Sequence, residues 1–186
     1  MITWPVQRPT LIDGNLTLRP WSMDDVSTVY QICQDPVIAL YTTVPVPYTE
    51  FHARVFIENQ DDNFDRHDSM AFAGVVNGEV VLCVSLHSVK EFDHLCELGY
   101  WVAAQARGEG YASRAATLAS NFALSIGFRR VEAFTDPDNE ASRRTLIRAG
   151  FQMESILPQR MTRRDGTQTD AIMFSKFAAS GLTGKQ

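Results

Sequence analysis

One stretch decides the fold: residues 97–116, ELGYWVAAQARGEGYASRAA. An apolar and aromatic run over residues 95–102 predicts a buried strand, and the Ala-rich segment after Gly110 predicts a helix. Gly108 and Gly110 allow the loop between them to adopt positive φ angles and to bring its main chain close to a ligand. Such a turn points backbone N–H groups and the positive end of a helix dipole at one place, which suits an anion such as a phosphate.

Two other classes of phosphate-binding loop fit this stretch less well. A P-loop requires G-x-x-x-x-G-K-[ST], and no lysine lies between Lys90 and Lys176. A dinucleotide-binding loop requires G-x-G-x-x-G, which G108-E-G-Y-A-S113 matches in part, with Glu132 about twenty residues further on. Ser113 replaces the third small residue, and Glu132 lies inside the next expected strand, so this class is disfavoured.

Three segments resemble the GNAT superfamily of acetyltransferases. Q105-A-R-G-E-G-Y-A112 resembles the [QR]-x-x-G-x-[GA] signature, whose loop holds the pyrophosphate of acetyl-CoA. D136-P-D-N-E-A-S-R-R-T-L-I-R-A-G-F151 resembles the loop and helix that follow in that family. L16-T-L-R-P-W21 resembles the opening strand of the ribosomal-protein serine/alanine N-terminal acetyltransferase subgroup. Together the segments extend the resemblance over most of residues 14–176.

The resemblance implies a single-domain α/β fold over residues 15–177. Its sheet would be mixed and mostly antiparallel, with about seven strands and with helices on both faces. Residues 1–14 would form a lead-in segment, and residues 178–186 would form a flexible tail rich in small and polar residues.

The hydrophobic pattern agrees with this fold. Asn77-Gly78 predicts a type I′ hairpin between two apolar runs. A helix between residues 95–102 and 131–135 predicts that these two strands run parallel. Residues 61–68, which hold four acids and no apolar period, are expected to form a surface loop.

Composition limits the class of protein. With 186 residues, 45% of them hydrophobic, the chain is long enough for one compact domain. Its net charge of −5 argues against a nucleic-acid partner. No apolar run approaches the ~18 residues of a membrane span, no secretory signal is visible, and the three cysteines are expected to be reduced. We therefore expect a cytoplasmic protein with no membrane partner, as a monomer or a homodimer.

Charge is distributed unevenly along the chain. Residues 1–126 carry 7 Lys and Arg against 15 Asp and Glu, whereas residues 127–186 carry 10 against 7. An acidic front half suits a cationic acceptor, and a basic back half suits an anionic cofactor. Both halves are equally compatible with ordinary solvated faces.

The resemblance implies which residues hold acetyl-CoA, the cosubstrate. The backbone of three strand residues would bind the pantetheine arm and supply an oxyanion donor, and the loop amides would bind the pyrophosphate. Asn139 resembles the asparagine that contacts the cofactor in the family, and Ser142 is also expected to contact the cofactor. Arg107 and Arg114 would add positive charge near the loop. The predicted cofactor-binding residues are Trp101, Val102, Ala103, Gln105, Arg107, Gly108, Glu109, Gly110, Tyr111, Ala112, Asn139 and Ser142.

Amine acetylation needs a base, because an ammonium group carries a proton at neutral pH. Glu97 is the first candidate, since it lies in an apolar run where a carboxylate becomes a stronger base, and family members often place a base on this strand. An ion pair with an arginine or exposure to solvent is the alternative role for Glu97. His87, His94 and a water molecule remain alternative bases.

The leaving thiolate needs a proton, for which many family members use a tyrosine on or just after the helix of the second block. The last tyrosine of this chain is Tyr111, so that residue is missing. Ser142 is the candidate acid, in keeping with the ribosomal-protein subgroup, and capping of the helix by Asn139 or Ser142 is its alternative role. No metal site is expected, because the four histidines lack ligand spacing.

These residues predict direct acetyl transfer to a primary amine, without an acyl-enzyme. By resemblance the acceptor is a peptide or protein N-terminal α-amine, and a polyamine, amino acid or antibiotic amine is the alternative. In the family one wall of the acceptor groove lies between the first two helices, here with Tyr41, Tyr48 and Phe51. A catalytically silent acyl-CoA-binding module is the rival from another class.

Overall fold

A single twisted sheet forms the centre of the molecule. A computed structural model describes residues 1–178, which form eight strands in the order β1-β2-β3-β4-β5-β6-β8-β7. Neighbouring strands are antiparallel except β5 and β6, which confirms the predicted mixed sheet. The strands are β1 (Leu11–Asp13), β2 (Leu16–Arg19), β3 (Met70–Val76), β4 (Glu79–Lys90), β5 (Leu95–Val102), β6 (Arg130–Thr135), β7 (Gln152–Thr162) and β8 (Gln168–Phe177).

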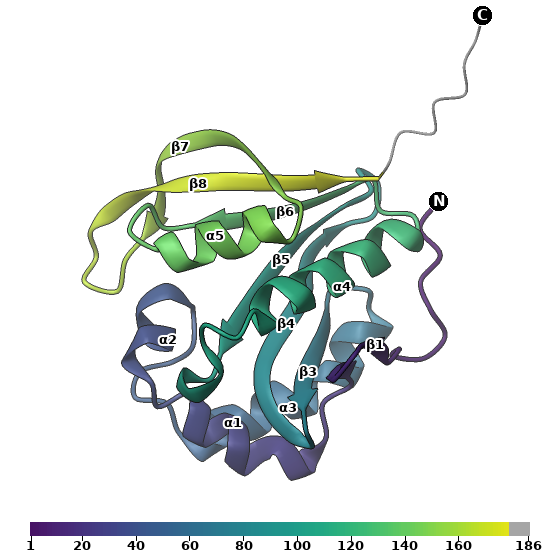
Figure 1. Cartoon of the computed structure of the whole chain (residues 1–186), viewed down its shortest axis with the longest axis vertical. Helices are drawn as coiled ribbons and strands as arrows, with labels where there is room; N and C mark the ends of the chain where they lie inside the picture. Colours follow the sequence, from purple (N-terminus) through teal and green to yellow (C-terminus); the bar gives the residue numbers. More distant parts are fainter. Residues whose placement is uncertain (179–186) are drawn as a thin grey trace, which may run out of the picture.

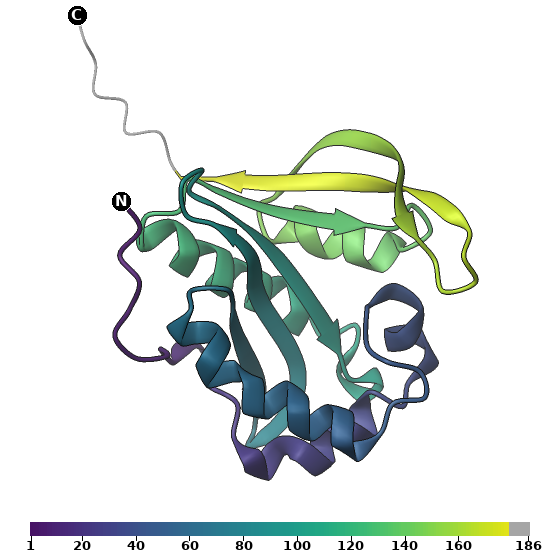
Figure 2. The ribbon, with the colours of Figure 1, turned by 180° about the vertical axis from the view of Figure 1, so that it is seen from behind.

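Helices cover both faces of the sheet, as predicted. Figure 1 shows α4 crossing in front of the sheet with α5 above it, and Figure 2 shows α3 and α1 on the opposite face. Among these helices, none combines the length and apolar character that a bilayer crossing requires. The described helices are α1 (Val26–Ile32), α2 (Pro36–Tyr41), α3 (Glu50–Asp65), α4 (Tyr111–Ser125) and α5 (Glu140–Arg148), with 3-10 turns η1 (Met23–Asp25) and η2 (Ala104–Ala106).

The core has one part on each face of the sheet. On the first face, small side chains of α4 lie against the strands: Ala115, Ala116 and Ala119 are each 0% exposed. Their spacing places them on one side of the helix, so the backbone of α4 approaches the sheet closely. On the second face, α1, α2 and α3 bury a separate cluster around Val29 and Ala53.

Two expectations change at the edges of the fold. The lead-in segment 1–14 contains β1, which pairs with β2 through Ile12 and Thr17 and adds an eighth strand to the seven expected. Of the expected tail, residues 178–186, all but Ala178 lies outside the described residues.

The expected surface loop over residues 61–68 is wrong for its first part, because α3 continues to Asp65. Phe64 is 6% exposed and extends a buried stripe that already includes Ile57 and Gln60. Trp4 of the lead-in packs on Phe64 with ring centroids 5.5 Å apart. The helical spacing of apolar residues therefore continues into this stretch, but Phe64 is its one apolar residue among the acids.

Strands β5 and β6 pair over only three residues. The partners are Leu95 with Arg130, Cys96 with Val131, and Glu97 with Glu132. Beyond Glu97 the strands run apart, although β4 stays paired with β5 as far as Val102 and β8 stays paired with β6 as far as Thr135. Figure 1 shows the two strands starting together and separating toward α2. The divergence leaves the edge of β5 beyond Glu97 without pairing to β6.

The turn between β7 and β8 joins two distant parts of the chain. Arg163 holds Asp136, in the loop before α5, through two hydrogen bonds of 2.9 Å. Arg164 donates to the carbonyl oxygens of Ala39, Thr42 and Val44, at and after the end of α2. The turn therefore fixes α2 relative to the loop before α5.

We expect Gly74→Ala to destabilise the protein by about 1–3 kcal/mol, the usual cost of overpacking. Gly74 of β3 pairs with Leu82 of β4, and a Cβ atom there would lie 2.3 Å from Leu82 Cδ1 and 2.4 Å from Cγ. The free energy of unfolding in urea measures the effect. In a Leu82→Ala background the same substitution should cost less, and an equal cost in both backgrounds would contradict the clash.

We expect Asp136→Asn to lower stability at pH 7. The hydrogen bonds from Arg163 hold the pKa of Asp136 below its ordinary value of 3.8. A lowered pKa stabilises the folded state above pH 3.8, and this stabilisation is lost as pH falls further. The difference from wild type should therefore shrink below pH 3.8 in urea unfolding measured across pH. Asp138→Asn is the control, because Asp138 also contacts Arg163 but its side chain is 70% exposed, and an equal loss there would refute the assignment to Asp136.

Candidate active site

The loop between β5 and α4 exposes its main chain. Gly108 and Gly110 have φ angles of 85° and 79°, and a Cβ atom built on either residue would meet nothing within 4 Å. Gly110 is the N-cap of α4 and has no side chain to cap the helix. The loop thus combines a left-handed backbone with open space on its outer side.

Backbone N–H groups in this loop lack acceptors. Within the part of the chain described, none of the amides from Gly108 to Ser113 donates a hydrogen bond, and the first amide of this region that does is Arg114, to Gly110 O at 3.2 Å. The helix dipole of α4 adds partial positive charge at the same place. This arrangement is able to hold an anion through the main chain alone.

The two arginines beside the loop are engaged elsewhere. Arg107 Nη2 lies 2.6 Å from Asp35 Oδ2, at the start of α2, and Nε and Nη2 both donate to Val102 O. Arg114 Nε lies 2.7 Å from Asp13 Oδ2, in β1. Both side chains therefore link the loop to neighbouring elements instead of adding free charge to it.

The remaining loop residues lie around a shallow cavity. Gln105 and Glu109 have exposed side chains, and together with Tyr111 they line a hollow of about 430 Å³ next to the turn between β3 and β4. Ala112 follows in the first turn of α4.

Alternation along β5 decides which backbone groups are available to a ligand. Ala103 N donates to Val81 O at 2.8 Å, so Ala103 faces β4. In an antiparallel ladder the next residue points away and the one after points back, so Trp101 also faces β4, while Tyr100 and Val102 face the side where β6 has diverged. Of the three strand residues expected to contact the cofactor, Val102 is the one oriented for it, and its carbonyl already accepts from Arg107.

Glu97 lies where β5 and β6 separate. It is the last residue of β5 paired with β6 and lies opposite His87 of β4. Among the described residues, its carboxylate has no hydrogen bond or ion pair, because Arg130 of the adjacent strand pairs with Glu132 and Glu154. The alternative role of Glu97, a structural ion pair with an arginine, is therefore not what the structure shows.

His87 lies beside Glu97 and uses space that Gly99 leaves empty. Its Nε2 is 2.9 Å from where a Cβ atom on Gly99 would be. The pKa of His87 is lowered, because burial disfavours the charged ring, an effect that the Glu97 carboxylate partly opposes. His94 Nδ1 donates to Gly127 O at 2.8 Å, and so has a structural contact in a different region.

Ser142 and Asn139 lie at the start of α5. Asn139 Oδ1 accepts from Ser142 N at 3.0 Å and caps the helix, so the capping role belongs to Asn139. Ser142 Oγ instead lies 2.8 Å from Tyr100 Oη. Burial raises the pKa of Tyr100 and keeps its hydroxyl protonated.

Sequence reasoning missed Tyr100 as a partner of Ser142. The tyrosine that many family members use belongs to the second block, whereas this hydroxyl comes from β5. The available signal was register: Tyr100 shares its strand face with Cys96 and Leu98, which pack toward α4. That face also carries α5.

A further buried hydroxyl belongs to the same region. Thr135, the last residue of β6, is 3% exposed, and its Oγ1 has no hydrogen-bond partner among the described residues. It lies on the stretch of β6 that has separated from β5.

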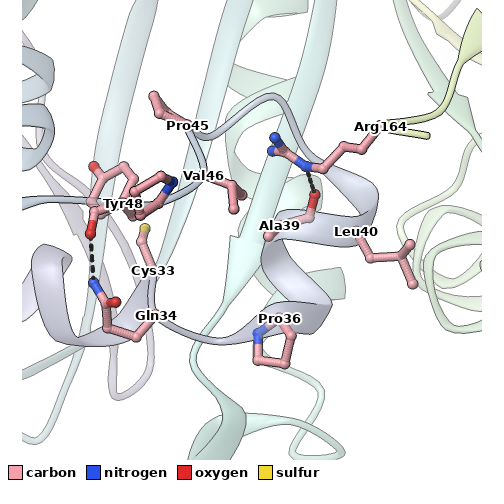
Figure 3. Close-up of a pocket in the computed structure, with 10 residues that line it drawn as sticks. Cys33, Gln34, Pro36, Ala39, Leu40, Pro45, Val46, Tyr48 and Arg164 are labelled. Atoms are coloured by element: carbon pink, nitrogen blue, oxygen red, sulfur yellow. Dashed lines mark hydrogen bonds between the residues drawn. The ribbon is translucent and has the colours of Figure 1, made fainter. Parts of the chain in front are cut away.

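The expected acceptor wall contains a cavity of about 360 Å³ (Figure 3). Tyr48 lines it together with Leu40 of α2 and Arg164. Phe51 does not contribute, since it is 68% exposed on α3, and Tyr41 ends α2. Among the described residues, no group of histidines, cysteines and acids has the arrangement of a metal site.

Comparison with known proteins agrees with this geometry. Residues 15–152 match the family model described as the Acetyltransferase (GNAT) domain. The chain is also similar to the uncharacterized N-acetyltransferase p20 of Bacillus licheniformis, with 27% identity over 170 residues that cover 89% of this chain and 94% of the relative.

Two solved structures share the fold. RimL, a ribosomal L7/L12 α-N-protein acetyltransferase in complex with coenzyme A, has a TM-score of 0.84 at 18% identity, with 91% of this chain and 98% of that chain covered. The microcin C7 self-immunity acetyltransferase MccE, in complex with acetyl-CoA and AMP, has a TM-score of 0.82 at 20% identity, with 89% and 93% covered. Because the family model spans most of its length, the chain belongs to the GNAT family and is an acetyl-CoA-dependent N-acetyltransferase.

Proposed function

We propose that the acceptor is a peptide or protein N-terminal α-amine, which attacks the thioester directly. The observation that carries the proposal is the unpaired Glu97 carboxylate at the point where β5 and β6 separate. An α-amine has an ordinary pKa of about 8, so a carboxylate, directly or through water, is a sufficient base for it. The fold of RimL, whose name gives a ribosomal α-amine as its substrate, supports the same class.

A small-molecule amine is the second candidate. The shared fold of MccE, an immunity acetyltransferase, supports it. A polyamine or lysine-like amine has an ordinary pKa of about 10.4 and needs a stronger base than an α-amine does. Within this chain the second basic group beside Glu97 is His87, whose lowered pKa keeps it neutral near pH 7.

The loop after β5 is proposed to hold the cofactor. Amides from Gly108 to Ser113 would bind the pyrophosphate, and the backbone of Tyr100 and Val102 would bind the pantetheine arm along the free edge of β5. Acetyl-CoA supplies the activated acyl group as a thioester. An N–H group of this edge would then donate to the carbonyl oxygen as negative charge develops there.

The proposed base and the Tyr100–Ser142 hydroxyl pair lie on opposite faces of the sheet. Glu97 and His87 lie on the sheet face that also carries Trp101, toward α1 and α3, whereas Tyr100 and Ser142 lie on the face of α4 and α5. The base and the hydroxyl pair are thus on opposite sides of the diverging strands. This separation suits a reaction in which one group removes a proton and another supplies one.

We expect Glu97→Gln to reduce kcat/KM by about 100-fold or more, the usual range for loss of a general base. Free-thiol release from acetyl-CoA is measured with a panel of a serine- or alanine-starting peptide, a polyamine and free amino acids. The deficit should shrink toward pH 9, where an α-amine is already neutral. Glu132→Gln is the matched control, since Glu132 is the neighbouring carboxylate but is paired with Arg130. Full activity of Glu97→Gln would refute its role as the base, and preference for a polyamine over the peptide would refute the acceptor class.

We expect Gly108→Ala to weaken coenzyme A binding as well as stability. An alanine at φ 85° costs about 1–2 kcal/mol, and its methyl group would occupy part of the open space beside the loop that is proposed to bind the pyrophosphate. Gly166→Ala is the control, because Gly166 has φ 86° and equally open surroundings in the turn between β7 and β8. Calorimetric titration with coenzyme A should show a loss only for Gly108→Ala. Equal affinity for both variants would contradict the role of the loop.

A further inference from the structure

The hydrogen bond between Tyr100 and Ser142 spans the diverging strands. Tyr100 Oη lies 2.8 Å from Ser142 Oγ and 3.2 Å from Ser142 O, and so connects β5 to the first turn of α5. Tyr100 and Ser142 are both half-buried, and burial raises the pKa of the Tyr100 hydroxyl. The pair lies on the face of the sheet that carries α4 and α5, where the backbone edge of β5 is free.

The chemistry of the reaction asks for a proton at this place. Breaking a thioester leaves a thiolate, whose conjugate acid has an ordinary pKa of about 8.5. Serine is a far weaker acid than a thiol, so Ser142 alone has no drive to give up its proton. Tyrosine has an ordinary pKa of about 10, and although burial raises the pKa of Tyr100, its phenol remains a far stronger acid than a serine hydroxyl. A serine that gains a proton from a tyrosine in the same step in which it gives one up does not become an alkoxide.

The position of the pair at α5 supports such a transfer. Ser142 is in the first turn of α5, whose N-terminus is capped by Asn139, so the positive end of the helix dipole lies beside both hydroxyls. Negative charge that passes from sulfur toward Tyr100 would be stabilised there.

We propose that Tyr100 is the proton source for the leaving thiolate and acts through Ser142. As the C–S bond breaks, its electron pair stays on sulfur, sulfur takes the Ser142 Oγ proton, and Ser142 takes the proton of Tyr100. The tyrosinate then regains a proton from water, and the proton removed from the amine passes to water through the base. The inference rests on the proposed acetyl transfer and assigns Tyr100 a role beyond it.

The test measures the chemical step directly, by rapid-quench single turnover of acetyl-CoA with the best amine of the panel. We expect Tyr100→Phe to slow this step at least about tenfold, while the affinity for coenzyme A stays within about twofold of wild type. The solvent deuterium isotope effect on the step should also fall. Tyr30→Phe, which removes a tyrosine hydroxyl on α1, is the matched control and should change neither quantity.

Changing only the acidity of the phenol distinguishes proton transfer by Tyr100 from a purely structural role of its hydrogen bond between β5 and α5. Fluorotyrosine placed at position 100 keeps the hydroxyl and nearly the same shape, and it folds even if Tyr100→Phe does not. We expect the single-turnover rate to change with phenol acidity, and an unchanged rate would overturn the inference. If wild type releases no thiol with any amine, the proposed function fails instead, so the two failures are distinguishable.

Discussion

Three residue pairs between β5 and β6 control the geometry of the active site. Each strand keeps its outer neighbour over its whole length, β4 for β5 and β8 for β6, so neither is free to bend back toward the other. The divergence leaves backbone groups of Tyr100 and Val102 without a hydrogen-bond partner on a neighbouring strand. An unpaired backbone group destabilises the fold unless another donor or acceptor replaces the missing partner. One of these groups, Val102 O, receives the Arg107 guanidinium. The others face the side from which β6 has diverged.

Arginine side chains hold the elements around this divergence. Arg107 links the loop between β5 and α4 to Asp35 at the start of α2, and Arg164 donates to carbonyl oxygens at and after the end of the same helix. Arg163, next in sequence to Arg164, holds Asp136 before α5. The short helix α2 is therefore fixed at both ends by residues far from it in sequence. These contacts hold α2 and the residues after it beside the loop between β5 and α4.

Local signals in the sequence were sufficient for much of the fold. The glycines at 108 and 110, the Asn77-Gly78 turn and the small residues of α4 each require one local structure, and each is found. Long-range contacts were not predictable in the same way. The hydroxyl of Tyr100 contacts Ser142, which lies 42 positions further along the chain, and Arg107 contacts Asp35, which lies 72 positions before it. Contacts over such separations produce no periodic pattern in the sequence. The end of α3 was missed for another reason, because one phenylalanine among several acids outweighs them once Trp4 packs on it.

The empty position at Gly99 links two residues on different strands. The His87 ring occupies the volume that any side chain at position 99 would need, and it lies there beside Glu97. Positions 87 and 99 therefore share a single space, and a larger residue at one is compatible only with a smaller residue at the other. In an alignment of close relatives this would be seen as covariation between the two positions, without any change in the residues that contact the cofactor.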